Sequence, residues 1–222
     1  MLFRSLEGGA AALGSLAEWL VEWKWDGIRA QIVRRNGRAA IWSRGEELIT
    51  ESFPELEQLA QKLPEGCVID GEIVALEGSA PAPFAKLQQR LNRKRITSAV
   101  LAAVPTGFVA YDLLELDAAD LRSLPLLERR QRLSALMSEL GPFGASLSVS
   151  PQVAFREWEE LEHCRARARE RGAEGVMLKS LASPYGVGRK RGAWWKWKAD
   201  PFTVDGVLVY RSEEHTSELQ SH

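Results

Sequence analysis

One lysine near the start of the sequence has neighbours that suit covalent chemistry. Lys24 lies between Trp23 and Trp25, and it is followed by Gly27, which allows a ligand to approach the backbone closely. At the usual pKa of about 10.4, only about one lysine in a few thousand is uncharged at neutral pH. A nucleophilic lysine therefore needs desolvation or a nearby cation, and Arg29 is the expected neighbour. The alternative is a lysine on a solvated strand face.

Two glutamates and two lysines further along the chain could serve a phosphorylated ligand. Glu72 and Glu174 would accept from ribose hydroxyls or bind a Mg²⁺ ion that keeps most of its waters. Lys196 and Lys198 alternate with tryptophans, so on a strand they would present two positive charges on one face. Taken singly, each glutamate could equally be a salt-bridge partner, and the lysines could be an ordinary basic strand face.

Strands must position most of these residues. Within residues 21–33, Glu22, Lys24 and Asp26 fall on one face and tryptophans on the other. Arg35-Asn-Gly-Arg38 predicts a hairpin turn. Strands and helices interleave without regular alternation, which favours an α+β fold with antiparallel sheets over a doubly wound parallel sheet. Strands are expected at residues 21–33, 39–43, 67–76, 107–116, 175–179, 193–198 and 203–210, and helices at 53–63, 84–94, 125–140 and 155–171.

Composition narrows the class of protein. The 222 residues contain 29 Lys and Arg against 30 Asp and Glu, so a surface for nucleic acid would have to be local. The hydrophobic fraction of 45% is ordinary for a soluble globular protein, and no segment has the length of a membrane span. Cys67 and Cys164 are too few for a disulfide framework or a zinc site, which favours a reducing cytoplasm. We therefore expect a cytoplasmic protein without a signal peptide or membrane contact.

Both ends of the chain look foreign to the rest. Residues 211–222 have no apolar period, and they read as a translated sequencing-library adapter. Residues 1–5 match the opposite strand of the same adapter. We therefore expect residues 1–5 and 211–222 to be adapter-derived, and we leave both segments out of the fold prediction.

Six short segments follow one another along the chain: Lys24-Trp-Asp-Gly-Ile-Arg29, Trp42-Ser-Arg-Gly45, Asp70-Gly-Glu72, Ala110-Tyr-Asp-Leu-Leu114, Glu174-Gly-Val-Met-Leu-Lys179 and Trp195-Lys-Trp-Lys198. Taken together and in this order, they resemble the motifs of covalent nucleotidyltransferases, the superfamily of ATP-dependent DNA ligases, RNA ligases and capping enzymes. The residues around Lys24 and the segment Asp200-Pro-Phe-Thr-Val-Asp205 are most similar to bacterial ATP-dependent DNA ligases of the multidomain repair type.

The resemblance implies a fold and a domain boundary. The fold would be a nucleotidyltransferase (ATP-grasp-like) domain of two antiparallel sheets flanked by helices, at residues 6–202. Residues 203–210 would be the first strand of an OB-fold domain that the chain does not complete. A fragment of this kind would form an adenylated lysine slowly or not detectably, and it would seal nicks poorly.

The resemblance also assigns roles to residues. Lys24 would attack the α-phosphorus of ATP to form lysyl-AMP. Tyr111 would stack on adenine, and Glu22 would accept a hydrogen bond from the adenine amino group. Glu72 and Glu174 would also hold Mg²⁺ or Mn²⁺. The implied nucleotide-binding set is Glu22, Lys24, Arg29 (on the ribose side), Arg44, Glu72, Tyr111, Glu174, Lys179, Lys196 and Lys198, the last three contacting phosphates.

Nicked double-stranded DNA is the partner that the resemblance implies, with the protein acting as a monomer. Arg44 would bind the 5′-phosphate of the nick, since a guanidinium fork suits phosphate. A basic cluster would contact the backbone without reading sequence. An RNA ligase or a capping guanylyltransferase is the nearest alternative, and a noncatalytic DNA-binding remnant is another. The implied DNA-binding residues are Arg44, Lys86, Arg90, Arg93 and Lys94.

Overall fold

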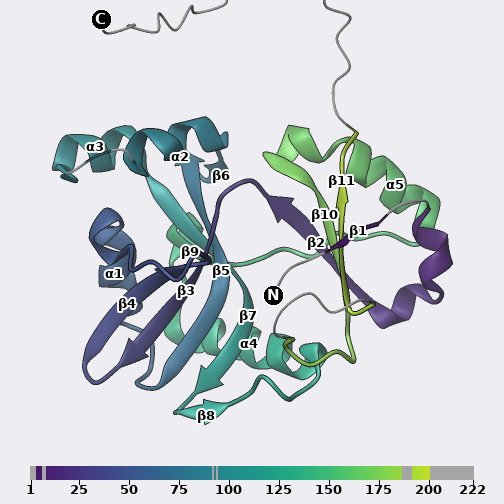
Figure 1. The fold of residues 1–222 in the computed structure, drawn as a ribbon, viewed down its shortest axis with the longest axis horizontal. Coiled ribbons are helices and arrows are strands. Elements are labelled where there is room, and N and C mark those ends of the chain that lie inside the picture. Colours follow the sequence, from purple (N-terminus) through teal and green to yellow (C-terminus); the bar gives the residue numbers. More distant parts are fainter. Residues whose placement is uncertain (1–3, 7–8, 92, 94, 187–191, 201–222) are drawn as a thin grey trace, which may run out of the picture.

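The computed structural model describes residues 4–6, 9–91, 93, 95–186 and 192–200, and it consists of two β-sheets that face each other with helices on their outer sides (Figure 1). One sheet has the strand order β1-β11-β10-β2. The other has the order β4-β3-β5-β7-β8, with β6 paired to β5 and β9 paired to β7. The strands are β1 Arg4–Ser5, β2 Trp19–Trp25, β3 Ile28–Arg35, β4 Arg38–Ser43, β5 Cys67–Glu77, β6 Ala80–Pro81, β7 Thr106–Leu116, β8 Ala119–Asp120, β9 Leu147–Val149, β10 Ala173–Ser180 and β11 Trp194–Lys198.

The expected α+β fold with antiparallel sheets is confirmed. Among the described strands, only the pairs β1–β11 and β7–β9 run parallel. The helices lie on the outer sides of the sheets and along the lower side of the molecule in Figure 1. They are α1 Pro54–Ala60, α2 Phe84–Leu91, α3 Ser98–Ala103, α4 Leu126–Leu140 and α5 Trp158–Ala166, with short 3-10 turns at Ala10–Leu13, Leu16–Glu18, Thr50–Ser52, Gly144–Ser146 and Ala168–Arg171.

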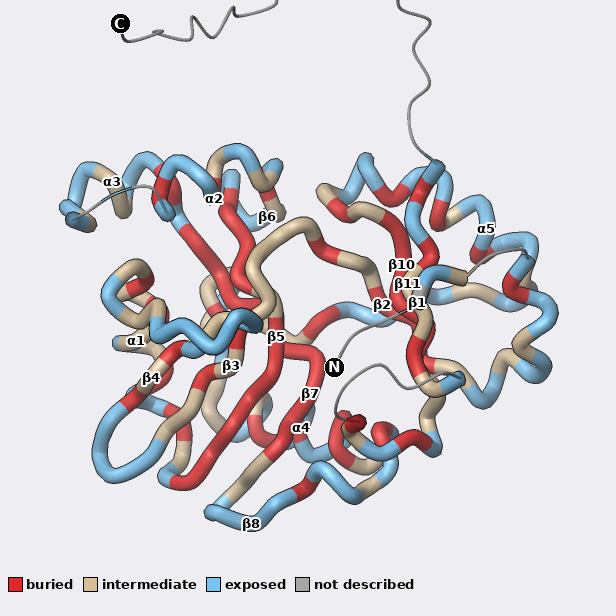
Figure 2. The backbone as a smooth tube through the Cα atoms, in the orientation of Figure 1, coloured by how far each residue is buried: buried red, intermediate tan, exposed pale blue. Residues whose placement is uncertain are grey.

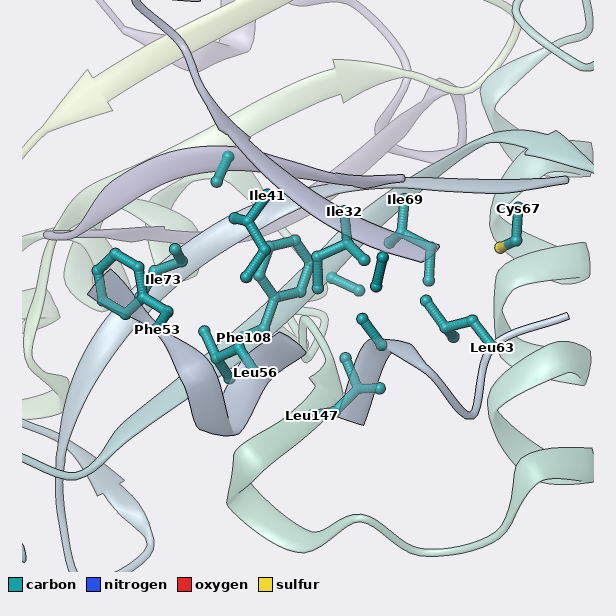
Figure 3. Packing of buried hydrophobic residues seen from close by; sticks show 14 of the residues in the cluster. Ile32, Ile41, Phe53, Leu56, Leu63, Cys67, Ile69, Ile73, Phe108 and Leu147 are labelled. Atoms are coloured by element: carbon teal, nitrogen blue, oxygen red, sulfur yellow. The ribbon is translucent and has the colours of Figure 1, made fainter. Parts of the chain in front are cut away.

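The larger sheet has the larger hydrophobic core. Ile32, Ile69, Ile73 and Phe108 are at most 1% exposed and pack in one cluster with Leu56 of α1, as Figure 3 shows. In Figure 2, β5 and β7 are buried along most of their length. This burial on both faces explains why the two strands read as nearly continuous apolar runs. The strands that carry Glu72 and Tyr111 therefore lie in the core of the larger sheet.

The hairpin between β3 and β4 forms where the sequence predicts it. Asn36 and Gly37 have φ angles of 53° and 73°, and these positive values are those that a two-residue hairpin turn of the primed type requires. The turn fixes the register that pairs Gln31 with Trp42 and Ala30 with Ser43. It thereby places the segment of Arg44 beside Arg29, whose carbonyl accepts from the Arg44 N–H at 3.0 Å.

Two expected helices are shorter than their apolar patterns indicate. The helix expected at 84–94 ends at Leu91. The helix expected at 155–171 is split into α5 and a separate 3-10 turn, Ala168–Arg171, which ends at Gly172 in the left-handed conformation. The strand expected at 203–210 lies outside the described residues. Arg4 and Ser5, which the adapter interpretation sets aside, pair with Trp195 and Lys196 of β11.

Candidate active site

The register of β2, β10 and β11 brings Glu22, Lys24, Lys196 and Lys198 to one face of the smaller sheet, which is called the pocket face below because it lines the pocket between the two sheets. Gly175 of β10 pairs with Lys24 of β2 on one side and with Lys198 of β11 on the other. Two residues along, Met177 pairs with Glu22 and with Lys196. Because side chains alternate along a strand, these residues share one face of the sheet. The opposite face packs into a hydrophobic cluster with Val21, Val176, Leu178 and Trp197.

Gly175 is required at the centre of this face. Its φ is +152°, and a β-carbon there would lie 2.2 Å from the carbonyl oxygen of Trp197. The register of β10 against β2 shifts between Ala173 and Gly175, which marks a bulge. The glycine therefore allows the strands of Lys24 and Lys198 to close on either side of β10.

The larger sheet contributes Arg29, Glu72 and Tyr111. Arg29 of β3 pairs directly with Glu72 of β5. Tyr111 of β7 lies at a second bulge, because Asp70 pairs with Asp112 while the next residue, Gly71, pairs with Ala110. A bulge of this kind turns a side chain to a new direction, and here it presents the tyrosine to the cleft between the sheets.

A single pocket of about 330 Å³ between the two sheets collects these side chains. It is lined by all ten residues that the sequence implied for nucleotide binding, together with Trp23, Trp25 and Met177. The ten come from strands β2, β3, β5, β7, β10 and β11 and from the segment after β4. A second pocket of about 320 Å³ shares Arg29 and Arg44 with the first and is also lined by Gln31, Trp42, Asp70 and Tyr185.

Lys24 meets a carboxylate in this structure. Its Nζ donates to Glu174 Oε2, and the same oxygen lies 3.1 Å from Lys198 Nζ. The expected neighbour, Arg29, instead pairs with Asp70 through contacts of 2.6 Å and 3.2 Å. The side chains of Lys24 and Glu174 are 22% and 29% exposed, so water and ligands reach this pair.

The two pocket glutamates have different proton affinities. Burial raises the pKa of Glu72 to about 8, although the charges of Lys24 and Arg29 act against the shift. Burial also acts to raise the pKa of Glu174, but hydrogen bonds and charges from Lys24 and Lys198 outweigh it and hold that pKa below its ordinary value. One carboxyl is thus largely protonated at neutral pH and the other is ionised.

The pocket suits a metal ion that shares its ligands with a phosphate. The described residues contain no group of three or more His, Cys, Asp or Glu side chains arranged to hold a metal. Two carboxylates nevertheless line one pocket beside the lysines, and Mg²⁺ is commonly bound by one or two carboxylates together with substrate phosphates. Glu72 and Glu174 therefore fit such an ion only when a phosphorylated ligand completes its coordination.

Glu22, Lys179 and Tyr111 form the innermost part of the pocket. Lys179 Nζ donates to Glu22, and Arg130 of α4 lies 3.0 Å from the other carboxylate oxygen. Lys179 Nζ also lies 4.2 Å from the centroid of the Tyr111 ring and 4.6 Å from that of Trp194. Glu22 is 1% and Tyr111 8% exposed, so this end of the pocket is preorganised and nearly dry.

Three residues of the site had no role in the sequence prediction. Asp70 belongs to a quoted motif, but only its buried pairing with Arg29 reveals its use. Tyr185 lies in the connection between β10 and β11, where its hydroxyl donates to Asp70 at 2.8 Å. Arg130 belongs to a helix whose apolar period does not distinguish it from a surface arginine. Spacing does not reveal these roles, because the partner of each residue lies far away in the sequence.

The basic residues expected to contact DNA differ in how far they are exposed. Arg90 is fully buried and pairs with Glu55 at 2.5 Å, so assigning it to DNA binding was wrong. Arg90 lies on the side of α2 that packs inward, and its guanidinium also donates to the carbonyls of Ser52 and Val104. Lys86 is half-buried and lies 3.2 Å from Glu77, whereas Arg44 and Arg93 are exposed. The last member, Lys94, lies outside the described residues.

Comparison with solved structures places this fold among DNA ligases. The mycobacterial DNA ligase D complexed with ATP and MES superposes with a TM-score of 0.68 at 29% identity, over 88% of this chain and 59% of that one. A Chlorella virus DNA ligase-adenylate shares the fold with a TM-score of 0.64 at 22% identity, over 89% of this chain and 67% of that one. Within the part of the chain that the structure describes, no helix is long and apolar enough to cross a membrane.

Sequence relatives agree with the fold. A probable DNA ligase of Koribacter versatilis is 34% identical over 94% of this chain and 40% of its own length. A DNA ligase of Natronomonas pharaonis is 34% identical over 92% of this chain and 37% of its own length. The chain thus spans about two fifths of these curated relatives. The family model of the ATP dependent DNA ligase domain matches residues 1–198, and the chain belongs to that family.

Proposed function

We propose that this chain is the adenylation domain of an ATP-dependent DNA ligase and that Lys24 is its nucleophile. Lys24 Nζ would form a bond to the α-phosphorus of ATP while the bond from that phosphorus to pyrophosphate breaks. The AMP would then pass to a DNA 5′-phosphate, and attack by the 3′-hydroxyl would seal the nick and release AMP. The observation that carries the proposal is the single pocket that joins Lys24 with the nine other implied nucleotide contacts.

The residues around Lys24 have the charges that this reaction needs. Phosphoryl transfer is catalysed mainly by positioning and by cations on the phosphate oxygens. Lys196 and Lys198 would provide them from β11, and Lys179 from β10. Since Lys24 and Glu174 are partly exposed, Lys24 would exchange its carboxylate for the α-phosphate and lose its proton to water in the open pocket.

A bound Mg²⁺ or Mn²⁺ ion would supply further neutralisation of the phosphate charge. Glu72 and Glu174 would hold it, and coordination would favour the ionised form of Glu72.

At the inner end of the pocket, Glu22 would accept a hydrogen bond from the adenine amino group. The Lys179 and Arg130 charges fix its carboxylate in place, which supports a choice of ATP over GTP.

The second pocket supports a DNA end as the acceptor. Arg44 and Arg29 line both pockets, so a 5′-phosphate bound by Arg44 would lie next to the adenylate. Arg44 is exposed, and it follows Trp42, whose side chain is 42% exposed. Nicked double-stranded DNA is therefore the proposed partner.

Intact-protein mass after incubation with ATP and Mg²⁺ tests the proposal. We expect an acid-labile AMP adduct that accumulates slowly on the wild type during prolonged incubation and is absent from Lys24→Ala. The same slow adduct should form on Lys62→Ala, whose lysine is exposed and lies outside the pocket. GTP should give no adduct. An adduct that survives in Lys24→Ala would overturn the assignment of the nucleophile, and equal labelling by GTP would favour a capping guanylyltransferase. DNA binding that Lys24→Ala leaves unchanged, with no adduct on the wild type even at prolonged incubation, would favour the noncatalytic remnant.

A further inference from the structure

Tyr185 connects the two sheets at the edge of the nucleotide pocket. It belongs to the connection between β10 and β11, and its hydroxyl donates to Asp70 Oδ2 at 2.8 Å. The same hydroxyl accepts from Arg29 Nη2 at 3.1 Å and from Gln31 Nε2 at 3.3 Å. Asp70 and Arg29 are on the larger sheet, whereas the connection leads from Lys179 to the β11 lysines.

The hydroxyl completes a closed hydrogen-bond ring. Arg29 Nη2 lies 2.6 Å from Asp70 Oδ2 and 3.1 Å from the Tyr185 hydroxyl, and that hydroxyl bonds to the same carboxylate oxygen. Asp70 is 0% exposed, so its carboxylate depends on these donors. Burial and the neighbouring charge of Asp70 raise the pKa of Tyr185 well above its usual range, so the hydroxyl keeps the proton that it donates.

Residues of β11, of α4 and of the segment before α4 hold the tyrosine ring in place. The ring meets Trp194 edge-on with 6.4 Å between centroids, and Arg129 lies 5.9 Å from its centroid. The Tyr185 N–H donates to the carbonyl of Arg122 at 2.8 Å. With its ring and backbone fixed, the hydroxyl can limit the positions that the Arg29 guanidinium adopts.

We propose that Tyr185 is a positioning residue that holds Arg29 in the orientation needed to bind the nucleotide. This inference rests on the proposed function, in which the pocket shared by Arg29 and Lys24 takes ATP. Arg29 lines both pockets, and Tyr185 lines only the second, so the tyrosine acts through the arginine rather than on the nucleotide. Loss of the hydroxyl should weaken ATP binding more than it slows the attack by Lys24.

The test compares Tyr185→Phe with Ser183→Ala. Ser183 lies in the same connection and its hydroxyl bonds to Ser180 and Trp194, so the control disturbs the connection without touching Arg29. ATP affinity is measured by quenching of tryptophan fluorescence, since Trp23 and Trp25 line the pocket. A hydrogen bond to a charged group is lost, so we expect Tyr185→Phe to raise the Kd for ATP about fivefold or more. The labelling rate at saturating ATP should change less than about twofold, and Ser183→Ala should keep the wild-type Kd.

A second measurement does not depend on ATP. Arg29 Nε–H donates to Asp70 Oδ1 at 3.2 Å, so its hydrogen exchange, followed by ¹⁵N NMR, reports how firmly the guanidinium is held. Exchange should be faster in Tyr185→Phe and unchanged in Ser183→Ala. Unchanged exchange and Kd in Tyr185→Phe, or equal shifts in both variants, would overturn the positioning role. Wild-type protein that does not bind ATP would overturn the proposed function, while the exchange measurement would still decide the role of Tyr185.

Discussion

Two regions of the molecule hold their charged side chains in different ways. On the pocket face of the smaller sheet, Lys24 and Lys198 share Glu174, and the three side chains are 22%, 53% and 29% exposed. Beneath the larger sheet, Arg129 and Asp112 are both fully buried and joined by two hydrogen bonds of 2.8 Å and 2.9 Å. The first group is open to water and the second is closed to it.

A ligand can take the place of one partner in an exposed ion pair, whereas both partners of a buried ion pair are needed for a stable fold. A partly exposed pair gains little net free energy, because water competes for both charges. Its partners can therefore exchange for phosphates at small cost. A buried pair that loses one member leaves an uncompensated charge in an apolar region, which is strongly unfavourable. The carboxylate that Lys24 and Lys198 share is therefore replaceable, whereas the Arg129–Asp112 pair is part of the fold.

Removing the buried carboxylate tests the comparison most severely. Asp112→Ala leaves the Arg129 guanidinium buried with its carboxylate partner gone, and we expect the free energy of unfolding to fall by about 3–5 kcal/mol. Denaturant unfolding measures the change. The matched control is Asp120→Ala, which removes an exposed partner of Arg122 and should alter stability little. Equal effects of the two substitutions would contradict the distinction between buried and exposed pairs.

The raised pKa of Glu72 predicts a dependence of stability on pH. The folded carboxyl has a pKa of about 8 against about 4.5 when unfolded, so the folded state binds the proton more tightly. Stability from this group is full below about pH 4.5, and it is lost as the pH rises to about 8, at up to about 1.4 kcal/mol per pH unit. Glu72→Gln should flatten this part of the profile, measured without nucleotide.

The control for this pH profile is Glu47→Gln, which changes an exposed glutamate outside the pocket and should keep the wild-type slope. A wild-type stability that rises between pH 5 and pH 8, or a slope that Glu72→Gln leaves intact, would show that Glu72 ionises as an ordinary surface carboxyl does.

Replacing the shared carboxylate of the pocket should affect stability least. Because Glu174 and both lysines are partly exposed, Glu174→Gln should change the free energy of unfolding by less than about 1 kcal/mol. Adenylation should nevertheless fall by about tenfold or more, since the variant loses the charge that orders the lysines and that would bind the proposed metal ion. Thermal unfolding and intact mass give the two numbers. A large loss of stability would place Glu174 with the buried pairs.

Several parts of the fold and site follow from local sequence. The hairpin at Asn36 and Gly37 forms as predicted, because a two-residue turn with positive φ at both positions leaves few alternatives. The alternation of Lys196 and Lys198 with tryptophans is also local, since a strand places every second side chain on one face. The family-like motifs supplied the ten pocket residues, and the structure brings all ten to one pocket.

A basic residue in a sequence can lie at the surface or pair with an acid in the core, and the sequence does not show which. Arg90 belongs to the same run of basic residues as Arg93, yet its guanidinium turns inward to Glu55 and two backbone carbonyls. A sequence records the charge of an arginine but not which acid folds against it. The division between α5 and the 3-10 turn after it likewise depends on packing, which overrides the continuous helical pattern.

The sequence by itself predicted most of the strands, because turns and side-chain alternation are local properties. The resemblance of its motifs to those of covalent nucleotidyltransferases indicated which side chains could act on a nucleotide. Only the tertiary structure decided their partners. Lys24 meets Glu174 across 150 residues, and Tyr185 meets Asp70 across 115. Such contacts depend on the register and approach of two sheets, which are fixed by the burial of apolar faces remote from the pocket.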